Sequence, residues 1–230
     1  MCGRYTVAKG SLKKFEETLG IRVPEISSRY NVCPGQDNPV IRGGSEVTGF
    51  SCDVMRWGFL PNWLNESDTQ ASTINARVET VSEKPYFRDA YSQRRCLVPA
   101  DGYYEWQQVG KAKIPHYIQG ESEVFAFAGL WDERRDTRPD SASSYAIITT
   151  AAAECIRFIH HRMPVVLPQR HWKAWLDAAT PPDALPSILK DGCADFQSHA
   201  VSSLVNSREN EGPELVHPVK RSLQGEFDFT

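Results

Sequence analysis

The sequence lacks the features that would carry it into a membrane or an oxidising compartment. It contains no apolar run of about 18 residues, which excludes a transmembrane helix, and residues 1–20 contain no apolar segment of the signal-peptide type. The six cysteines are scattered, without a C-x-x-C pair or a Cys/His cluster of metal-ligand spacing. We therefore predict free thiols, no metal, no cofactor and no membrane partner, in a cytoplasmic protein that would be associated with the nucleoid in a prokaryote.

An excess of positive charge is also missing. Lysine and arginine number 26 against 29 aspartates and glutamates, so the net charge is −3 at pH 7. No field of the whole molecule would attract nucleic acid or anionic lipid, and any nucleic-acid binding must use a local patch. The chain contains no internal repeat and no low-complexity tract, which excludes solenoids and disordered arrays.

The chain does have enough apolar material for one core. Hydrophobic residues make up 40% of the 230 residues and include ten Phe, eight Tyr and six Trp. We predict one α+β domain over residues 1–219, with a curved, mainly antiparallel, barrel-like sheet and short flanking helices. A flexible tail is expected at 220–230, and we expect a monomer.

Local patterns predict where the elements lie. Short runs rich in β-branched and aromatic residues predict strands at 54–57, 96–98, 103–109, 116–119, 124–131, 145–150 and 163–167. The stretch 110–113 is typical of a hairpin loop, and 134–144 of a surface loop. Helical patterns occupy 11–19, 151–159, 171–178 and 184–190, and Gly20 is a natural stop for the first of them.

The start of the chain, Met1-Cys2-Gly3, could by itself provide reactive groups. A residue as small as Cys2 permits removal of Met1 by the usual aminopeptidase, which would leave an amine and a thiol on adjacent carbons. The unperturbed pKa values of these groups, about 8 and about 8.5, give both a reactive fraction at neutral pH. Such an aminothiol can attack an amide with its own amine as the base, or condense with an aldehyde to a thiazolidine ring.

Several loop-rich strings mix Gly, Pro, Arg, Asn and Trp in ways that a plain core does not need. They are residues 2–5 (Cys-Gly-Arg-Tyr), 29–35 (Arg-Tyr-Asn-Val-Cys-Pro-Gly), 55–63 (Met-Arg-Trp-Gly-Phe-Leu-Pro-Asn-Trp), 74–80 (Ile-Asn-Ala-Arg-Val-Glu-Thr), 99–106 (Pro-Ala-Asp-Gly-Tyr-Tyr-Glu-Trp) and 159–164 (Ile-His-His-Arg-Met-Pro). In this order, from Cys2 to about Pro218, the chain resembles the SRAP family, the SOS-response-associated peptidases also described as abasic-site processing or shielding proteins. The resemblance implies covalent capture of an abasic site in single-stranded DNA through a thiazolidine crosslink that shields the lesion.

The resemblance also implies four residues at the reaction centre. Cys2 would supply the nucleophilic sulfur and the amine. Asn75 would orient the amine or the sugar as a neutral amide. Glu105 would act as the acid and base that carries protons during loss of water, and His160 would open the sugar ring or shuttle protons.

DNA contacts follow from the same resemblance. Arg4, Arg77 and Arg162 would bind phosphates through their guanidinium groups. Trp106 and Trp63 would stack on bases or wedge between them beside the lesion. A few phosphate contacts on an acidic protein predict modest non-specific affinity with a shallow salt dependence.

The chain departs from the family pattern at three places. Cys33 stands where a small residue such as alanine is usual, and we expect a buried thiol of little consequence there. His161 replaces an acidic residue common beside the histidine, which affects the pKa or orientation expected for His160. The residues after Lys220 have no clear counterpart.

Three other readings of Cys2 stay open. Glutamine amidotransferases also begin Cys-Gly after processing, although the Asn-Gly oxyanion pair and synthase domain expected of that class are not apparent here. Cys2 could instead release Met1 or a short leader as an autopeptidase. In the third reading the protein is a non-catalytic module that binds single strands.

Overall fold

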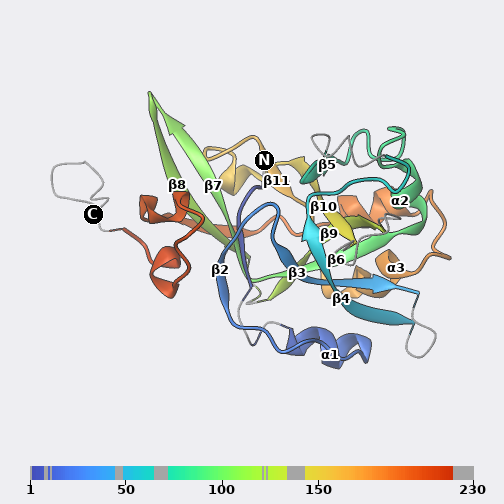
Figure 1. Ribbon diagram of the computed structural model, residues 1–230. Helices are drawn as coiled ribbons and strands as arrows, with labels where there is room; N and C mark the ends of the chain where they lie inside the picture. The colour runs from blue at the N-terminus through green and yellow to red at the C-terminus, as the bar shows by residue number, and fades with distance from the viewer. Residues whose placement is uncertain are drawn as a thin grey trace.

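Figure 1 shows a computed structural model, which describes residues 2–7, 10, 12–44, 49–64, 72–120, 122, 124–133 and 143–219. The predicted tail at 220–230, the first residue of the helix predicted at 11–19 and most of the loop at 134–144 lie outside the described residues. Within this part of the chain, no helix is both long and apolar enough to cross a membrane.

Five strands of the larger sheet close into a barrel. They are β3 (Asp37–Gly43), β4 (Phe50–Trp57), β6 (Arg95–Ala100), β9 (Phe125–Asp132) and β10 (Ser144–Ala151). β4, β3, β6, β9 and β10 are antiparallel neighbours in that order, and β10 returns to β4 through a parallel pairing. Closure leaves no free edge around this ring and buries its interior. The predicted barrel-like, mainly antiparallel α+β architecture is confirmed.

Three short strands extend the barrel along β9 and β10. They are β5 (Asn75–Arg77), β11 (Arg162–Pro164) and β12 (Val166–Leu167). β5 runs parallel to β10 and β11 runs antiparallel to it, while β12 pairs with β9. β5 belongs to the string at 74–80 and β11 to the string at 159–164. Because both strands pair with β10, these two strings meet at the carboxyl end of β10.

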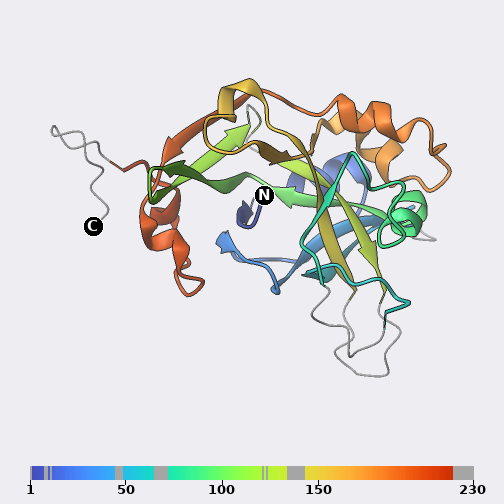
Figure 2. The same ribbon diagram turned by 90° about the horizontal axis from the view of Figure 1, so that it is seen from above.

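A second sheet holds a long hairpin. Its order is β13 (Phe196–Ala200), β8 (Ala112–Gly120), β7 (Gly102–Val109), β1 (Tyr5–Val7) and β2 (Arg29–Val32). The hairpin of β7 and β8, drawn in green, reaches out from the body of the molecule (Figures 1 and 2). The predicted loop at its tip is confirmed at Gly110, whose φ of 57° is the left-handed conformation that glycine tolerates.

Short helices cover the barrel. They are α1 (Lys13–Leu19), α2 (Arg88–Gln93), α3 (Trp172–Leu176) and α4 (Leu185–Lys190), with short 3₁₀ turns η2 (Glu154–Ile156), η3 (Gln169–His171), η4 (Ser203–Asn206) and η5 (Pro213–Val216). Gly20 ends α1 in the left-handed conformation, as predicted. Phe15 of α1 stacks on Trp172 of α3 with 4.3 Å between ring centroids, which fixes one helix to the other.

Two predictions about the region after β10 were wrong. Residues 151–159 were expected to be helical, but only the 3₁₀ turn at 154–156 forms. Strand pairing wins locally, because Ala151 pairs with Arg162 and the N–H of Ala152 donates to the carbonyl oxygen of His161. The single strand expected at 163–167 is divided at Val165, with one half on β10 and the other on β9.

Candidate active site

The segment that leads into β1 carries Cys2 alongside hairpin strand β7. The antiparallel pairing of β1 with β7 extends outward, because the backbone N–H of Tyr104 donates to the carbonyl oxygen of Arg4 at 3.0 Å. Continuing this register places Gly3 opposite Glu105 and Cys2 one position further, close enough for the carboxylate of Glu105 to act on the Cys2 thiol. The side chain of Cys2 is fully buried.

Asn75 holds the backbone of Cys2 from the barrel side. The parallel pairing of β5 places Asn75 opposite Ile147 of β10. Its Nδ2 donates a hydrogen bond of 2.9 Å to the carbonyl oxygen of Cys2. Its Oδ1 is buried and accepts no hydrogen bond from any described residue. Asn75 therefore fixes one peptide of the nucleophile and retains an acceptor that a ligand N–H or O–H could fill.

The thiol of Cys2 is held in its protonated form. Burial raises its pKa well above the ordinary value, and the nearby carboxylate of Glu105 raises it further. The Sγ lies 3.9 Å from the carbonyl oxygen of Arg4, a weak hydrogen bond that opposes the shift. A sulfur in this setting is a poor first nucleophile at neutral pH, because the thiolate is the attacking form.

Glu105, which lies near Cys2, is also close to His160. Glu105 is 4% exposed, and its Oε1 lies 3.9 Å from Nδ1 of His160. The same Nδ1 lies 3.0 Å from the N–H of Arg162 and 3.1 Å from its carbonyl oxygen. The first residue of β11 therefore orients the imidazole, and a proton on Nδ1 would face two oxygen atoms.

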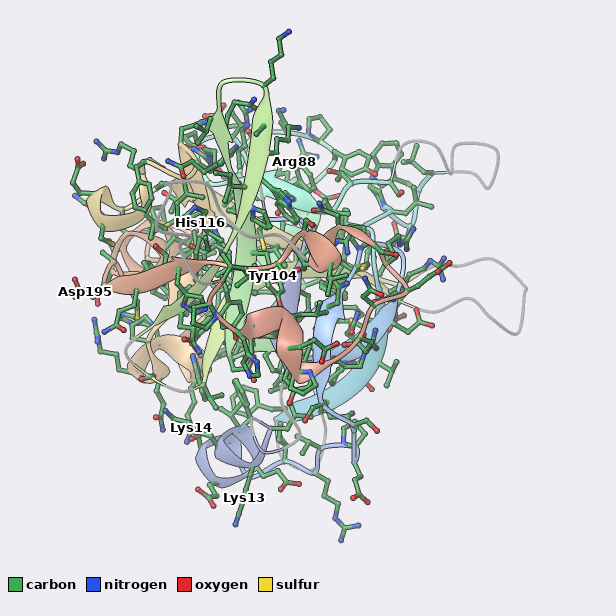
Figure 3. All side chains as sticks on the ribbon, turned by 90° about the vertical axis from the view of Figure 1, so that its left-hand side faces the viewer. Lys13, Lys14, Arg88, Tyr104, His116 and Asp195 are labelled. Carbon is green, nitrogen blue, oxygen red and sulfur yellow. The ribbon has the colours of Figure 1, made fainter. Side chains whose placement is uncertain are left out.

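A second imidazole faces Glu105 across the hairpin. His116 of β8 is directly opposite Glu105 in the register of β7 and β8, so both side chains are on one face of the hairpin. Its Nε2 lies 3.2 Å from Oε1 of Gln107, and its buried Nδ1 has no hydrogen-bond partner among the described residues. Figure 3 labels His116 together with Tyr104 of the neighbouring strand. No local pattern distinguishes His116, because its relation to Glu105 depends on the register of β7 and β8.

His161 sits at the mouth of the site. Its side chain is exposed, and its ring centroid lies 4.3 Å from that of His160. The positive charge of a protonated His160 lowers the pKa of His161 below the ordinary histidine value. Because His161 replaces the acidic residue that the family pattern leads one to expect, two imidazoles lie side by side here instead of one imidazole and a carboxylate.

Two of the three predicted phosphate-binding arginines lie on this side of the site. The side chain of Arg77 is exposed and makes no hydrogen bond or ion pair with a described residue. Arg162 is already engaged: both of its terminal nitrogens contact the carboxylate of Glu79, and Nη2 donates to the carbonyl oxygen of Thr149 at 2.7 Å. The guanidinium of Arg77 is therefore exposed to solvent, whereas that of Arg162 is held in a fixed orientation by Glu79 and Thr149.

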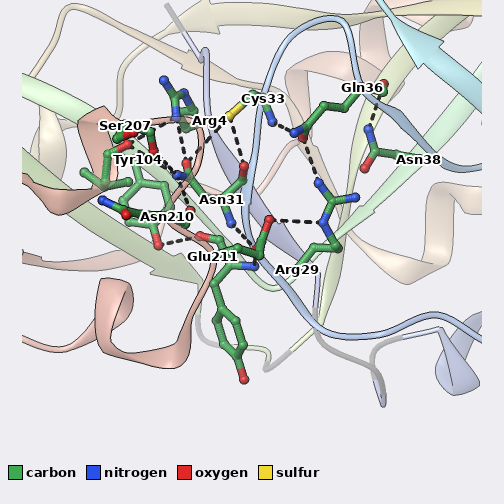
Figure 4. A network of polar contacts seen from close by, with 12 residues as sticks. Arg4, Arg29, Asn31, Cys33, Gln36, Asn38, Tyr104, Ser207, Asn210 and Glu211 are labelled. Atoms are coloured by element: carbon green, nitrogen blue, oxygen red, sulfur yellow. Dashed lines mark hydrogen bonds and ion pairs between the residues drawn. The ribbon is translucent and has the colours of Figure 1, made fainter.

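The third predicted arginine, Arg4, belongs to a different group. Its Nη1 donates to Oδ1 of Asn31 at 2.8 Å and to the carbonyl oxygen of Val205 at 3.1 Å (Figure 4). Its Nη2 donates to the carbonyl oxygen of Asn206 at 3.3 Å, and Oδ1 of the same Asn206 accepts the indole N–H of Trp106 at 2.8 Å. Arg4 and Trp106 are thus joined through one asparagine of η4.

A polar network fastens the carboxyl-terminal segment to β2. Asn31 donates through Nδ2 to the carbonyl oxygens of Ser207 and Asn210, both at 2.8 Å, and its N–H donates to Glu211 (Figure 4). Glu211 also pairs with Arg29 at 3.2 Å. The string at 29–35 was conspicuous in the sequence, but its partners at 205–211 are known only from the fold.

Of the remaining predicted residues, Cys33 lies as expected and Trp63 lies apart from the other site residues. Cys33 is buried as expected, and its Sγ lies 3.0 Å from the carbonyl oxygen of Asn31. Trp63 is exposed and contacts Tyr86 edge-to-face at 6.4 Å. No hydrogen bond, ion pair or ring contact between described residues joins Trp63 to the other predicted site residues.

An open cleft of about 670 Å³ lies beside the reactive pair. It is lined by Glu105, Trp106, Gln108, Lys113, Arg157, Phe158, Ile159, His160 and His161. Its walls come from the hairpin and from residues 157–161, so the buried carboxylate of Glu105 and the half-buried imidazole of His160 both lie beside it.

Comparison with known proteins gives one consistent result. The family model described as SOS response associated peptidase (SRAP) matches residues 1–208. The chain is 38% identical over 224 residues to the abasic site processing protein YoqW of Bacillus subtilis, with 94% of this chain and 99% of the relative covered. It is 31% identical to the abasic site processing protein YedK of Escherichia coli, with 95% and 100% covered. A crystal structure of a Bacteroides thetaiotaomicron protein matches with a TM-score of 0.81 and 26% identity, covering 95% of this chain and all of that one. The chain belongs to the SRAP family.

Proposed function

We propose that this protein processes abasic sites in single-stranded DNA, forming a covalent thiazolidine crosslink through Cys2 once Met1 has been removed. Relatives named abasic site processing proteins, similar over nearly the whole chain, support the substrate. One observation supports the chemistry most directly. The carbonyl of Cys2 is held by Asn75, and its thiol lies near Glu105, so the residue that would carry the amine has a fixed place beside a carboxylate that lines a cleft.

The protonated thiol favours an order of events in which the amine acts first. The α-amine of Cys2 attacks C1′ of the ring-opened sugar, an aldehyde, and gives a carbinolamine. Loss of water, with a proton delivered to the leaving hydroxyl, gives a Schiff base. The sulfur then adds to the imine carbon while the nitrogen takes up a proton, which closes the thiazolidine ring. Aldehyde and aminothiol are thereby converted into one ring and one water molecule, without oxidation or reduction.

The neighbouring groups have suitable positions for these steps. Glu105, 3.9 Å from Nδ1 of His160, would deliver the proton when water leaves, and the imidazole would replenish it. The unfilled Oδ1 of Asn75 would accept from the amine or from a sugar hydroxyl. Arg77 and Arg162 would hold phosphates on the barrel side, with Arg4 and Trp106 on the side of η4.

The decisive experiment joins protein to a defined lesion. The mature protein, with loss of Met1 verified by intact mass, is incubated with a single-stranded oligonucleotide carrying one abasic site, and the products are separated under denaturing conditions. We expect a stable adduct with the abasic strand and none with the intact strand. The same abasic strand after reduction of its aldehyde to an alcohol should also stay free, because it cannot form a Schiff base.

Protein variants test the two reacting groups. Cys2→Ala should abolish the adduct, whereas Cys33→Ala, which removes another buried thiol, should retain it. A form that keeps Met1 or an uncleaved tag should not form the thiazolidine, because its α-amine is on another residue. Adduct formation by Cys2→Ala, or at full rate by the blocked form, would contradict the mechanism.

Release of Met1 by Cys2 itself is a second candidate, favoured by the word peptidase in the family description. Synthesis in a cell-free system without aminopeptidase, followed by intact mass, tests it: self-release requires loss of Met1 from the wild type and not from Cys2→Ala. Cys2-dependent ammonia release from free glutamine would instead indicate the amidotransferase reading.

A further inference from the structure

The cleft beside Glu105 and His160 has a wall that the proposed chemistry does not use. Residues 152–161, drawn in gold, pass beside the hairpin of β7 and β8 in both views (Figures 1 and 2). Phe158 and Arg157 line the cleft from this segment, and Lys113 and Gln108 line it from the hairpin. None of these four residues has a role in the proposed formation of the thiazolidine. They line the same cleft as Glu105 and His160, which do have such a role.

Phe158 is a large aromatic side chain that the fold leaves in solvent. It is 56% exposed, whereas its neighbour Ile159 is 5% exposed and belongs to the core. Its ring packs perpendicular to that of His116, at 5.8 Å between centroids and an interplanar angle of 84°. The exposed ring is therefore in contact with a buried side chain on one side while it lines the cleft.

The cations of the cleft suit a nucleotide. Lys113 is exposed and forms no ion pair with a described residue. Arg157 is exposed and pairs with Glu154 at 2.8 Å through Nη1, a contact between two solvent-exposed groups that a phosphate can replace at small cost. A nucleobase offers a π-face for Phe158, and its phosphate offers an anion for the two cations.

From these observations we propose that the cleft is a nucleotide subsite of this protein. It takes the nucleotide adjacent to the abasic site, with the base stacked on Phe158 and the phosphate toward Lys113 and Arg157. The inference rests on the proposed function for the position of the lesion at Cys2. The proposal adds Phe158 as a stacking residue beside the hairpin face that carries Glu105 and His116. Trp106, by contrast, is held by its hydrogen bond to Asn206 of η4.

Two substitutions at Phe158, with a matched control, test the subsite. Phe158→Ala removes the ring and Phe158→Trp keeps an aromatic surface. Val54→Ala trims an apolar residue of similar exposure on β4. Each is combined with Cys2→Ala so that binding is non-covalent, and affinity is measured by fluorescence anisotropy on single strands with a stable abasic analogue. A fluorescent adenine analogue is placed next to the lesion, on its 5′ side in one strand and on its 3′ side in the other.

Stacking should appear as quenching of the fluorescent base on one side of the lesion. We expect Phe158→Ala to lose this quenching and to weaken binding by about 5- to 100-fold, the range for loss of one base–aromatic stack. Phe158→Trp should retain both, and Val54→Ala should behave as the parent. Equal quenching and affinity in Phe158→Ala and Val54→Ala would overturn the subsite.

A separate measurement keeps this result distinct from the proposed function. With Cys2 intact, the adduct assay is run on the natural abasic strand for wild type and Phe158→Ala. Adduct formation together with no effect of Phe158→Ala on binding would refute the subsite and leave the crosslinking proposal standing. Loss of quenching in Phe158→Ala, with no adduct from the wild type, would support the subsite and refute the crosslinking proposal.

Discussion

Arg77 and Arg162 are both expected to bind phosphate, yet the structure predicts different outcomes when each is replaced by glutamine. Arg77 is exposed and has no side-chain hydrogen bond or ion pair with a described residue. Arg162 makes a two-pronged contact with Glu79 and a 2.7 Å hydrogen bond to the carbonyl oxygen of Thr149. Arg77→Gln should therefore alter DNA binding alone, whereas Arg162→Gln should alter DNA binding and stability together.

The size of the binding effect follows from counterion release. Each phosphate neutralised on a single strand contributes about 0.7 to the slope of log affinity against log salt. Loss of one contact at about 0.1 M salt should then weaken binding about fivefold and reduce the slope by about 0.7. Both variants should show this change, measured by anisotropy titrations of Cys2→Ala protein across a series of salt concentrations.

The stability effect should separate them. The carboxylate of Glu79 is 49% exposed, so solvent screens the pair with Arg162 and limits its contribution to about 0.5–1 kcal/mol. With the bond to Thr149, about 1.5 kcal/mol is at stake in Arg162→Gln, or about 3–6 °C in Tm. Arg77→Gln should shift Tm by less than about 2 °C. An unchanged salt slope in Arg77→Gln would refute the assignment of Arg77 to phosphate, and equal Tm losses would refute the distinction between the two arginines.

Three further predictions concern the proton-transfer centre, the hairpin and η4. Glu105→Gln should slow adduct formation at neutral pH by about 100-fold or more with little change in non-covalent affinity, and an unchanged pH–rate profile would remove Glu105 from the mechanism. Burial and, to a lesser extent, His199 lower the pKa of His116, so the unfolded chain takes up a proton first as the pH falls. The stabilising effect of a neutral His116 should be complete above about pH 6.5 and lost as the pH falls toward its folded-state pKa, and urea titrations should show a shallower pH dependence in His116→Gln. Asn206→Ala should weaken DNA binding through loss of the acceptor that fixes Trp106, and Asn206→Asp, which keeps an acceptor oxygen, should restore the orientation of the indole as reported by its fluorescence; equal defects in the two variants would contradict a positioning role.

The sequence was most informative about elements whose pattern is local. Six predicted strands match β4, β6, β7, β8, β9 and β10 to within a few residues, because their alternating pattern and turn residues can be seen in consecutive positions of the sequence. Five strands were not predicted. β1, β2 and β5 are three or four residues long, too short for an alternating pattern to show, whereas β3 and β13 are seven and five residues long and were missed as well. The predicted helix at 151–159 failed because pairing with β11 decides the backbone there.

The site shows the same division between local and long-range information. Cys2 and Glu105 could be selected from their strings, and the fold does bring them together. The separation of the predicted DNA-binding residues into two groups could not be foreseen, because Arg4 and Trp106 meet through Asn206, about 200 and 100 positions away respectively. Trp63 was predicted together with Trp106, but the structure gives it no contact with either group among the described residues.

The network in Figure 4 links residue 31 to residues 207–211, and Arg4 to residues 205 and 206. The groups that anchor Arg4 and Trp106 therefore come from a segment about 200 and 100 positions away along the chain. A truncation that removes residues 201–219 would keep the hairpin strand that carries Glu105 but would release both side chains from η4. Loss of a distant segment would then be felt first as disorder of two predicted DNA contacts.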